Sequence, residues 1–521
     1  MSHPHFTRWP VAEAYCDPQS IVPGQPIRVR AASRTPRFEL VVTHVASDRT
    51  EYWRGEVECA DHGVRGGVWA TGCDWPVAVE LPTDGSWPSG FYELELTALG
   101  PLPGPDADDE RRRVSHAYVV VRPTRDTGTA DRPLLVLATN TWQAYNQWGG
   151  RCMYSGASKV SAARPLERGY LRRPIDDDGY DGRVANLERP ADREHRRLQR
   201  YLADHQLPLW NASSGWHTHE HRLVAWAARH DIDLDVAISN DLHDPDVALG
   251  LLDGRRLLIS AGHDEYWSWQ MRDHVDAFVE DGGNWLVLSG NTCFWQVRAE
   301  GDVMTCHKGG ARPRDPIFAT GSADLLTSMW SDPMIRRPET STTGLTFTRG
   351  GYHRVGDGVP DGAGGFTVHQ PEHWAFEGTD LRWGDQFGTV PVIVGYEVDG
   401  CAMEWRDGRP HATGADGASP DTKILATCPA RLLSITEDGC EPPEALWASV
   451  DPPGDLEGVA MILHGSEWAD HVDELGRGHA VMAEVPKGDG TIVNVGTTDW
   501  VHGLDDPVVD RITKNLFDRL S

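Results

Sequence analysis

From Pro133 onward, short apolar runs alternate with amphipathic ones, and this alternation constrains the fold more than any other feature of the chain. Four apolar runs are short enough to be buried strands, at 134–138, 236–238, 256–260 and 285–288. Helical patterns occur near 193–205, from about 219 to 229, and from 271 to 279. Strands that alternate with helices of about 10 to 15 residues are typical of βαβ units. The pattern predicts an α/β fold with a mostly parallel sheet and flanking helices.

The chain before Pro133 has a different character. From about residue 10 to 123, β-rich runs are separated by Pro and Gly turns, which predicts an N-terminal, immunoglobulin-like antiparallel β-sandwich over 1–123. The polar, aperiodic stretch 124–132 is predicted to be a linker. The α/β domain is expected at 133–521, with a β-rich insertion at about 300–480. The apolar run 491–495 is expected to rejoin the parallel sheet.

Composition excludes several classes of protein. The net charge of −29 argues against a nucleic-acid partner, because a basic patch is needed to displace counterions from phosphates. No run approaches about 18 consecutive apolar residues and the start of the chain is polar, so neither a membrane span nor a signal peptide is expected. We therefore expect a cytoplasmic protein. The nine cysteines are scattered without a CxxC pair, which suits neither a disulfide framework nor a zinc knuckle.

The turn after the 256–260 run holds four ionisable side chains in a row, His263, Asp264, Glu265 and Tyr266. In open α/β sheets the ligand crevice lies outside the carboxyl ends of the strands, so these groups could reach a substrate or a metal. A structural role is the alternative. The Asp264 charge could stabilise the start of the next helix, and Tyr266 could pack in the core.

Other predicted strand ends are also polar and rich in aromatic residues. Together with 263–266 they form five turns, at 140–146, 240–243, 290–293 and 498–500. Asn and Asp often satisfy their own turns, but the coincidence of these turns at one sheet edge favours a site. The predicted catalytic residues are His263, Glu265, Asn291 and Asp499. The predicted substrate-binding residues are Asn140, Trp142, Tyr145, Trp267 and Trp295.

Two kinds of chemistry are open at this edge. Cys293 follows a strand and a Gly-containing turn, so a Cys293–His263 dyad is one hypothesis. However, Trp295 stands where a nucleophile elbow has a small residue, and a free Cys is commonly a buried hydrophobe. A metal site is the other hypothesis, because phenolate and carboxylate are hard donors suited to ferric iron. The HExxH, EF-hand and P-loop signatures are absent.

A set of short motifs recurs in order from about residue 133 to 521, and together they resemble the large (beta) subunit of N,N-dimethylformamidase and its relatives. The motifs are 141–146 with 148–150, 241–243, 263–266, 290–291, 337–339, 373–374, 395–397 and 499–500 with Thr513 and Asn515. The resemblance implies a fold similar to class I glutamine amidotransferases. It also implies a small accessory subunit. The reaction it implies is hydrolysis of a small formamide at a mononuclear iron, which two tyrosines and one glutamate hold.

The resemblance transfers this iron site only in part. Tyr266 corresponds to one tyrosine ligand, and Glu339 is the nearest motif-bearing glutamate. The second tyrosine is expected just before the helix that contains Trp226, where this chain reads 219–222 and has no tyrosine. Glu220 or His221 is a candidate substitute. A different metal, or none, remains open.

The leading hypothesis is a metal-dependent hydrolase of small amide-like C–N bonds. In it, His263 moves protons at near-neutral pH, and Asn140, Asn291 and Asp499 orient the substrate. A noncatalytic carbohydrate- or protein-binding module on the same shell is the alternative, and a Cys293-dependent amidase is the third hypothesis. The expected partners are a small-molecule amide, the accessory subunit and a further copy of the chain.

Overall fold

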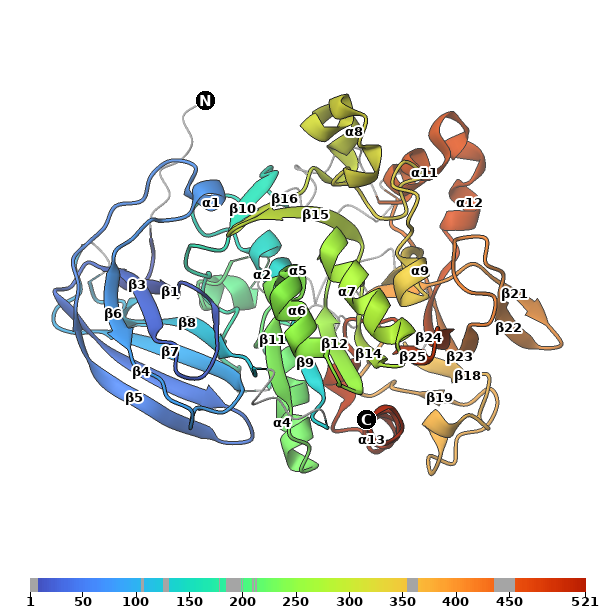
Figure 1. Ribbon diagram of the computed structural model, residues 1–521, viewed down its shortest axis with the longest axis horizontal. Helices are drawn as coiled ribbons and strands as arrows, with labels where there is room; N and C mark the ends of the chain where they lie inside the picture. The colour runs from blue at the N-terminus through green and yellow to red at the C-terminus, as the bar shows by residue number, and fades with distance from the viewer. Residues whose placement is uncertain are drawn as a thin grey trace.

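The structure, a computed structural model, describes residues 8–104, 107–124, 131–177, 179–183, 198, 200–208, 210, 213–353, 364–434 and 455–521. Parts of the predicted linker at 124–132 and of the predicted helix at 193–205 lie outside the described residues. Figure 1 shows the N-terminal strands gathered on one side of the molecule and the largest sheet at its centre.

Two β-sheets form the N-terminal region and share one apolar core. One sheet has the order β1 (Ala12–Cys16), β3 (Ile27–Ser33) and β6 (Val77–Leu81). The other has the order β2 (Ser20–Ile21), β8 (Val114–Val121), β7 (Gly90–Ala98), β4 (Arg37–Val45) and β5 (Arg49–Glu58). Apolar residues alternate along these strands, so one face of each sheet is turned inward. The domain boundaries at 123 and 133 stay predictions.

The central sheet has nine strands and is mixed. Its first five strands run parallel, in the order β11 (Asp235–Ile238), β9 (Leu134–Leu137), β12 (Leu257–His263), β14 (Asn284–Gly290) and β25 (Gly490–Asn494). Four antiparallel strands continue it, in the order β24 (Gly478–Lys487), β23 (Lys423–Ala430), β18 (Phe366–Val368) and β19 (Gln386–Phe387).

Helices cover both faces of the parallel part. Alternate residues of a strand point to opposite faces, so Leu258 packs with one set of helices and Ile259 with the other. The Leu258 face carries α6 (Pro245–Leu252) and α7 (Trp269–Glu280), and the Ile259 face carries α4 (Glu220–Arg229) and α13 (Pro507–Leu520). The side chain of Ser268, not of Asp264, caps α7 by accepting from the Met271 amide.

The prediction of a mostly parallel sheet, of the class I glutamine amidotransferase type, is wrong. The strand–helix alternation holds for β9 to β14, and β25 rejoins the sheet in parallel, but β24, β23, β18 and β19 join it by antiparallel pairing. The turn between β24 and β25 shows the reason, because Gly488 and Asp489 form a two-residue hairpin connection. Such a connection reverses the chain, whereas parallel neighbours need a long crossover. The remaining sheets are also largely antiparallel.

The smaller elements lie around this sheet. The other strands are β10 (Lys159–Ser161), β13 (Tyr266–Ser268), β15 (Trp295–Glu300), β16 (Val303–Thr305), β17 (Thr346–His353), β20 (Tyr396–Gly400), β21 (Met403–Arg406) and β22 (Arg409–Ala412). The other α-helices are α1 (Val68–Thr71), α2 (Thr139–Tyr145), α5 (Ser239–His243), α8 (Ala311–Arg314), α9 (Thr340–Thr343), α11 (Asp455–His464) and α12 (Val472–Leu475). The 3-10 helices are η1 (Glu110–Arg113), η4 (Lys308–Gly310), η5 (Pro316–Thr320), η6 (Ala323–Leu325), η8 (Trp374–Phe376), η9 (Gly465–Asp470) and η10 (Trp500–Gly503). Within the described part of the chain, no helix combines the length and the apolar character needed to cross a bilayer.

Candidate active site

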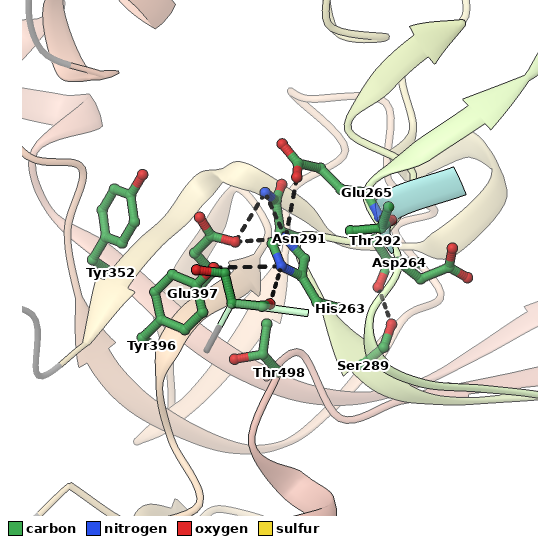
Figure 2. Close-up of polar contacts among 12 residues, drawn as sticks. His263, Asp264, Glu265, Ser289, Asn291, Thr292, Tyr352, Tyr396, Glu397 and Thr498 are labelled. Atoms are coloured by element: carbon green, nitrogen blue, oxygen red, sulfur yellow. Dashed lines mark hydrogen bonds and ion pairs between the residues drawn. The ribbon is translucent and has the colours of Figure 1, made fainter. Parts of the chain in front are cut away.

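The polar groups of the candidate site meet at the carboxyl ends of β12 and β14. His263 is the last residue of β12, and Asn291 directly follows β14. The two strands pair in parallel with His263 opposite Gly290, so both side chains lie at the same sheet edge. Glu397 reaches this edge from β20, as Figure 2 shows. A Cβ at Gly290 would lie 2.7 Å from the Glu397 carbonyl oxygen, so glycine there allows β20 to approach.

Two carboxylates flank the His263 imidazole (Figure 2). Nε2 of His263 lies 2.7 Å from Oε2 of Glu397 and 3.3 Å from Oε2 of Glu265. All three side chains are buried. Burial alone would lower the pKa of His263, but the charge and hydrogen bond of Glu397 outweigh it and raise the pKa to about 9. The imidazole therefore carries its second proton at neutral pH.

The position of that proton follows from the hydrogen bonds. Nδ1 of His263 lies 2.9 Å from the Ser213 carbonyl oxygen, which can only accept. Nδ1 therefore donates, and Nε2 shares the remaining proton with Glu397. The Asn291 amide donates from Nδ2 to Oε2 of Glu397 over 3.1 Å and holds the carboxylate in place. The pair thus keeps one proton between two defined atoms, Nε2 and Oε2.

Hydroxyl and indole donors surround Glu265 on the other side of His263. The Tyr154 hydroxyl lies 2.7 Å and 2.9 Å from its two carboxylate oxygens, and Nε1 of Trp295 donates to Oε1 over 2.7 Å. The Tyr266 hydroxyl donates to that of Tyr154 over 3.0 Å. The Tyr145 ring stacks on the Tyr154 ring with a centroid distance of 4.2 Å. Three phenols therefore gather around one carboxylate.

Burial shifts the pKa of each of these groups toward its neutral form. Burial raises the pKa of Glu265, and it raises the phenol pKa of Tyr154 and of Tyr266 well above the usual value, with the Glu265 charge adding to the effect. The Lys308 ammonium lies 3.1 Å from the Tyr154 ring centroid, and its charge favours an ionised Glu265. A further cation would be needed to stabilise a phenolate at this place.

Tyr154 supplies the second phenol that the sequence did not place. The predicted position was just before α4, but Tyr154 lies in the loop after α2, 112 residues before its partner Tyr266. The two tyrosines and Glu265 form a donor set of two phenols and one carboxylate. These hard oxygen donors suit a trivalent or divalent hard cation such as iron. The residues of this structure therefore fit the metal that the sequence resemblance implies.

The site opens onto a cavity of about 380 Å³. Its polar floor contains Glu265, Asn291 and Glu397. The apolar part of its lining is formed by Phe294, Met329, Phe347, Val459 and Ile462, and basic side chains of His307, Lys308 and Arg314 line it as well. Tyr352 and Asp455 also line the cavity; the Tyr352 hydroxyl donates to Asp455 over 2.5 Å, and burial raises the pKa of Asp455 to about 6. The cavity can hold a small organic molecule with its polar end at the floor.

The predicted substrate-binding residues take different places. Trp295 lines the cavity, and Tyr145 lies behind it against Tyr154. Asn140 donates from Nδ2 to the Tyr266 carbonyl oxygen over 3.1 Å, so it supports the site backbone. Trp267 likewise donates to the Asp264 carbonyl oxygen over 3.1 Å. Trp142 donates to Glu220 over 3.0 Å and lies in the core.

Four further predicted residues lie outside the lining of this cavity. The Glu339 carboxylate was expected to bind metal. Instead, its two oxygens accept hydrogen bonds from the hydroxyls of Ser331 and Thr346. Glu220 accepts from the Trp142 indole, and Nδ1 of His221 bonds to the Trp216 carbonyl oxygen. Asp499 pairs with Arg183 at 2.7 Å. These positions depend on long-range packing, which the short motifs did not contain.

Cys293 does not lie beside His263. Its side chain packs in the core on the α7 face of the sheet, in a cluster with Trp267 and Trp330. Burial raises the pKa of its thiol far above the ordinary value, whereas a nucleophilic thiol needs a lowered one. The geometry therefore gives no support to a Cys293–His263 dyad.

Glu397, Tyr352, Asp455 and Lys308 are site residues that sequence reasoning missed. The motif Gly395–Tyr396–Glu397 was part of the family resemblance, so Glu397 carried a signal but no role. Lys308 and Asp455 lie in the Gly- and Pro-rich region, where strand and helix patterns are weak. No local pattern connects them to His263.

Comparison with known proteins places the chain in a family. The family model described as N,N-dimethylformamidase beta subunit-like, C-terminal, matches residues 43–514. The N,N-dimethylformamidase beta subunit of Paracoccus aminophilus is 24% identical over 195 residues, and that of an Alcaligenes species is 23% identical over 195 residues. Each alignment covers 31% of this chain and 24% of the relative, so the chain spans about a quarter of the curated relatives it matches. Because the family model covers most of its length, this protein belongs to the N,N-dimethylformamidase beta subunit-like family.

Proposed function

We propose that this protein hydrolyses the C–N bond of small carboxamides at the floor of the 380 Å³ cavity, with a metal ion held at Glu265. One observation carries the proposal. Glu397, which shares a proton with His263, and Glu265, which accepts from the Tyr154 hydroxyl, line the same cavity, and Tyr266 donates in turn to Tyr154. The names of the two relatives, both N,N-dimethylformamidase beta subunits, support an amide as the substrate.

Glu265, Tyr154 and Tyr266 are the residues that would hold the ion, and Tyr145 is the alternative second phenol. The Tyr154 hydroxyl joins the other two groups, lying 2.7 and 2.9 Å from the Glu265 carboxylate oxygens and 3.0 Å from the Tyr266 hydroxyl. Iron is the proposed metal, since phenol and carboxylate donors favour it. When bound, such an ion supplies Lewis acidity, which polarises a carbonyl and lowers the pKa of water.

The His263–Glu397 pair handles the protons of the reaction. Amide hydrolysis adds water to the carbonyl carbon and breaks the C–N bond, so one proton leaves the water and one reaches the departing nitrogen. Oε2 of Glu397 and Nε2 of His263 already share a proton over 2.7 Å, which allows the pair to accept the first and deliver the second. Asn291 keeps the Glu397 carboxylate oriented through its hydrogen bond.

The apolar wall serves to exclude water and to hold the non-reacting part of the substrate. Phe294 and Phe347 lie on this wall, and the Trp295 indole both lines the cavity and bonds to Glu265. A drier floor strengthens each charge interaction made there. The apolar side chains therefore bind the non-reacting group, whereas the polar residues at the floor orient the amide.

The proposal is tested by assaying a panel of small amides, from formamide to N-aryl amides, by amine release. The wild type is compared with Glu397→Gln, and the metal content of each is measured by elemental analysis. We expect turnover of at least one amide by the wild type and a large loss in the variant at unchanged metal content. Metal-loaded wild type that turns over no amide in the panel would overturn the proposal and favour the noncatalytic binding module.

We also propose that the chain works in an assembly, because both relatives are named as beta subunits. The mass of the chain is 57.6 kDa. Light scattering on protein purified from its native cells should give a larger mass, with a small second chain visible on a gel. A monomer of the chain mass with full turnover would contradict this.

A further inference from the structure

A second group of ligand-type side chains lies close to the site and takes no part in the proposed reaction. Imidazole nitrogens of His219 and His502 and a carboxylate oxygen of Asp499 lie within 4.8 Å of one another. Nε2 of His502 is 4.0 Å from Oδ1 of Asp499. The two imidazole rings meet edge to face, with centroids 5.6 Å apart. All three side chains are buried.

The imidazoles of this group are unsatisfied. Nδ1 and Nε2 of His219 and Nε2 of His502 are buried and make no hydrogen bond of normal geometry with the described residues; the Ser213 backbone is the group nearest to serving His219. A buried polar group without a partner costs about 1–3 kcal/mol, so such groups are rare and need an explanation. Three such nitrogens beside one carboxylate form a donor set that a single cation could satisfy.

The charge state of the imidazoles suits a metal ion. Burial, together with neighbouring positive groups, lowers the pKa of His219 and His502 well below the usual value. Both rings are therefore neutral at pH 7, and the neutral imidazole is the form that binds a metal.

The Asp499 carboxylate is oriented for the same purpose. Arg183 donates to Oδ2 from Nε over 3.0 Å and from Nη2 over 2.7 Å. Oδ1 is left facing His502, with a 3.3 Å contact from the Thr498 hydroxyl. Metal-binding carboxylates are commonly held by such an outer hydrogen bond. Because the Arg183 charge opposes a cation, the two imidazoles must supply most of the affinity.

We propose that His219, His502 and Asp499 form a metal site for a divalent ion of the zinc type, separate from the Glu265 site. Two imidazoles and one carboxylate are a donor set that zinc and cobalt accept. Bonds of about 2.0–2.1 Å in a tetrahedral site separate the ligand atoms by roughly 3.4 Å. The three side chains therefore need to close by roughly 1 Å to bind the ion, which leaves a fourth position for water.

The location of this site connects it to His263. A Cβ at Gly262 would lie 2.2 Å from the Cβ of His219, so His219 rests directly against the backbone that precedes His263. His219 and Ser213 belong to one short segment, and the Ser213 carbonyl orients the His263 imidazole. His502 lies in η10, on the other side of the ion. A bound ion thus ties this segment to η10 and holds His263 in position.

Cobalt binding tests the proposal. Chelator-treated protein is titrated with Co²⁺ at pH 7, and the bound metal is counted by elemental analysis and followed by visible absorption. The titration is done in the Glu265→Gln background, which isolates the second site from the proposed catalytic one. We expect one Co²⁺ per chain in this background and none after a further His219→Gln or His502→Gln change.

His116→Gln is the matched control. His116, Glu93 and Glu95 also bring ligand atoms within 4.8 Å of one another, but their carboxylates already pair with Arg49 and Arg172. This variant should keep the cobalt. Circular dichroism and a cooperative thermal transition without metal show that each variant is folded, and a rise in Tm on adding Co²⁺ is expected only where the metal still binds. Folded His219→Gln and His502→Gln variants that bind as much Co²⁺ as their parent, or a parent that binds none, would overturn the proposal whatever the outcome for the amide reaction.

Discussion

The two carboxylates that face His263 belong to two very different regions of the molecule. Glu265 lies in the short turn between β12 and β13, two residues from His263 in the chain, and it accepts from phenol and indole groups. Glu397 lies on β20, in the region rich in Gly and Pro, and faces an imidazolium and an amide. The same residue type therefore acquires two tasks from its neighbours: one carboxylate suits a cation, and the other shares a proton.

The largest effect is expected from Glu265→Gln. The change removes the carboxylate that accepts from Tyr154 through both of its oxygens, so the donor set loses its anion. We expect loss of the bound metal and no measurable amide hydrolysis, checked by elemental analysis and amine release. A variant that keeps both metal and turnover would contradict the assignment of metal binding to Glu265 and proton transfer to Glu397.

Glu397→Gln should have a smaller effect that is confined to the chemical step. General acid–base groups contribute about 10²–10⁴-fold to rate, so we expect kcat to fall by about that factor. The metal content should not change, because the polar contacts of Glu397 in the described part of the chain are with His263 and Asn291. A variant that loses metal along with activity would show that Glu397 contributes to metal binding.

Tyrosine variants rank the donors around Glu265. Tyr154→Phe removes the hydroxyl that contacts both carboxylate oxygens, whereas Tyr266→Phe removes one that contacts Tyr154. We expect metal affinity to fall about 10–100-fold for Tyr154→Phe and less for Tyr266→Phe, measured by competition with a chelator. Tyr145→Phe is the third arm, and an effect larger than that of Tyr266→Phe would make Tyr145 the second ligand.

The smallest effect concerns a carboxylate outside the site. Burial alone would raise the pKa of Glu484 on β24, but hydrogen bonds from His373, Lys423 and Trp374 outweigh it and lower the pKa to about 2. This stabilisation is present above the ordinary pKa near 4.5 and is lost as the pH falls toward 2. We expect Glu484→Gln to lower the free energy of unfolding at pH 7 by about 1–3 kcal/mol.

The check is urea unfolding between pH 7 and pH 3. The difference between the wild type and Glu484→Gln should shrink as the pH falls. A difference that is independent of pH would contradict this. It would mean that Glu484 stabilises the fold through its packing and not through the ionised form of its carboxylate.

Part of this structure could be predicted from local sequence patterns. The strands at 257–263 and 284–290 are short apolar runs, and their ends carry His263, Glu265 and Asn291. Parallel pairing then brings His263 and Asn291 to one edge. The antiparallel strands of the central sheet were missed, because β18, β19 and β23 come from a region where no periodic pattern stands out. The Gly488–Asp489 pair between two apolar runs is a hairpin signal, which the prediction of a long crossover before β25 did not take into account.

The sequence by itself determined the polar strand ends and the residue types available for chemistry. It also determined the family, since the short motifs retain their order along the chain. Only the tertiary structure decided which groups meet: Tyr154 with Glu265, Glu397 with His263, and His219 with His502. The physical reason is the range of the interactions. A strand or a turn is specified by neighbours in the chain, whereas these contacts join residues far apart in sequence and depend on the packing of whole sheets and loops.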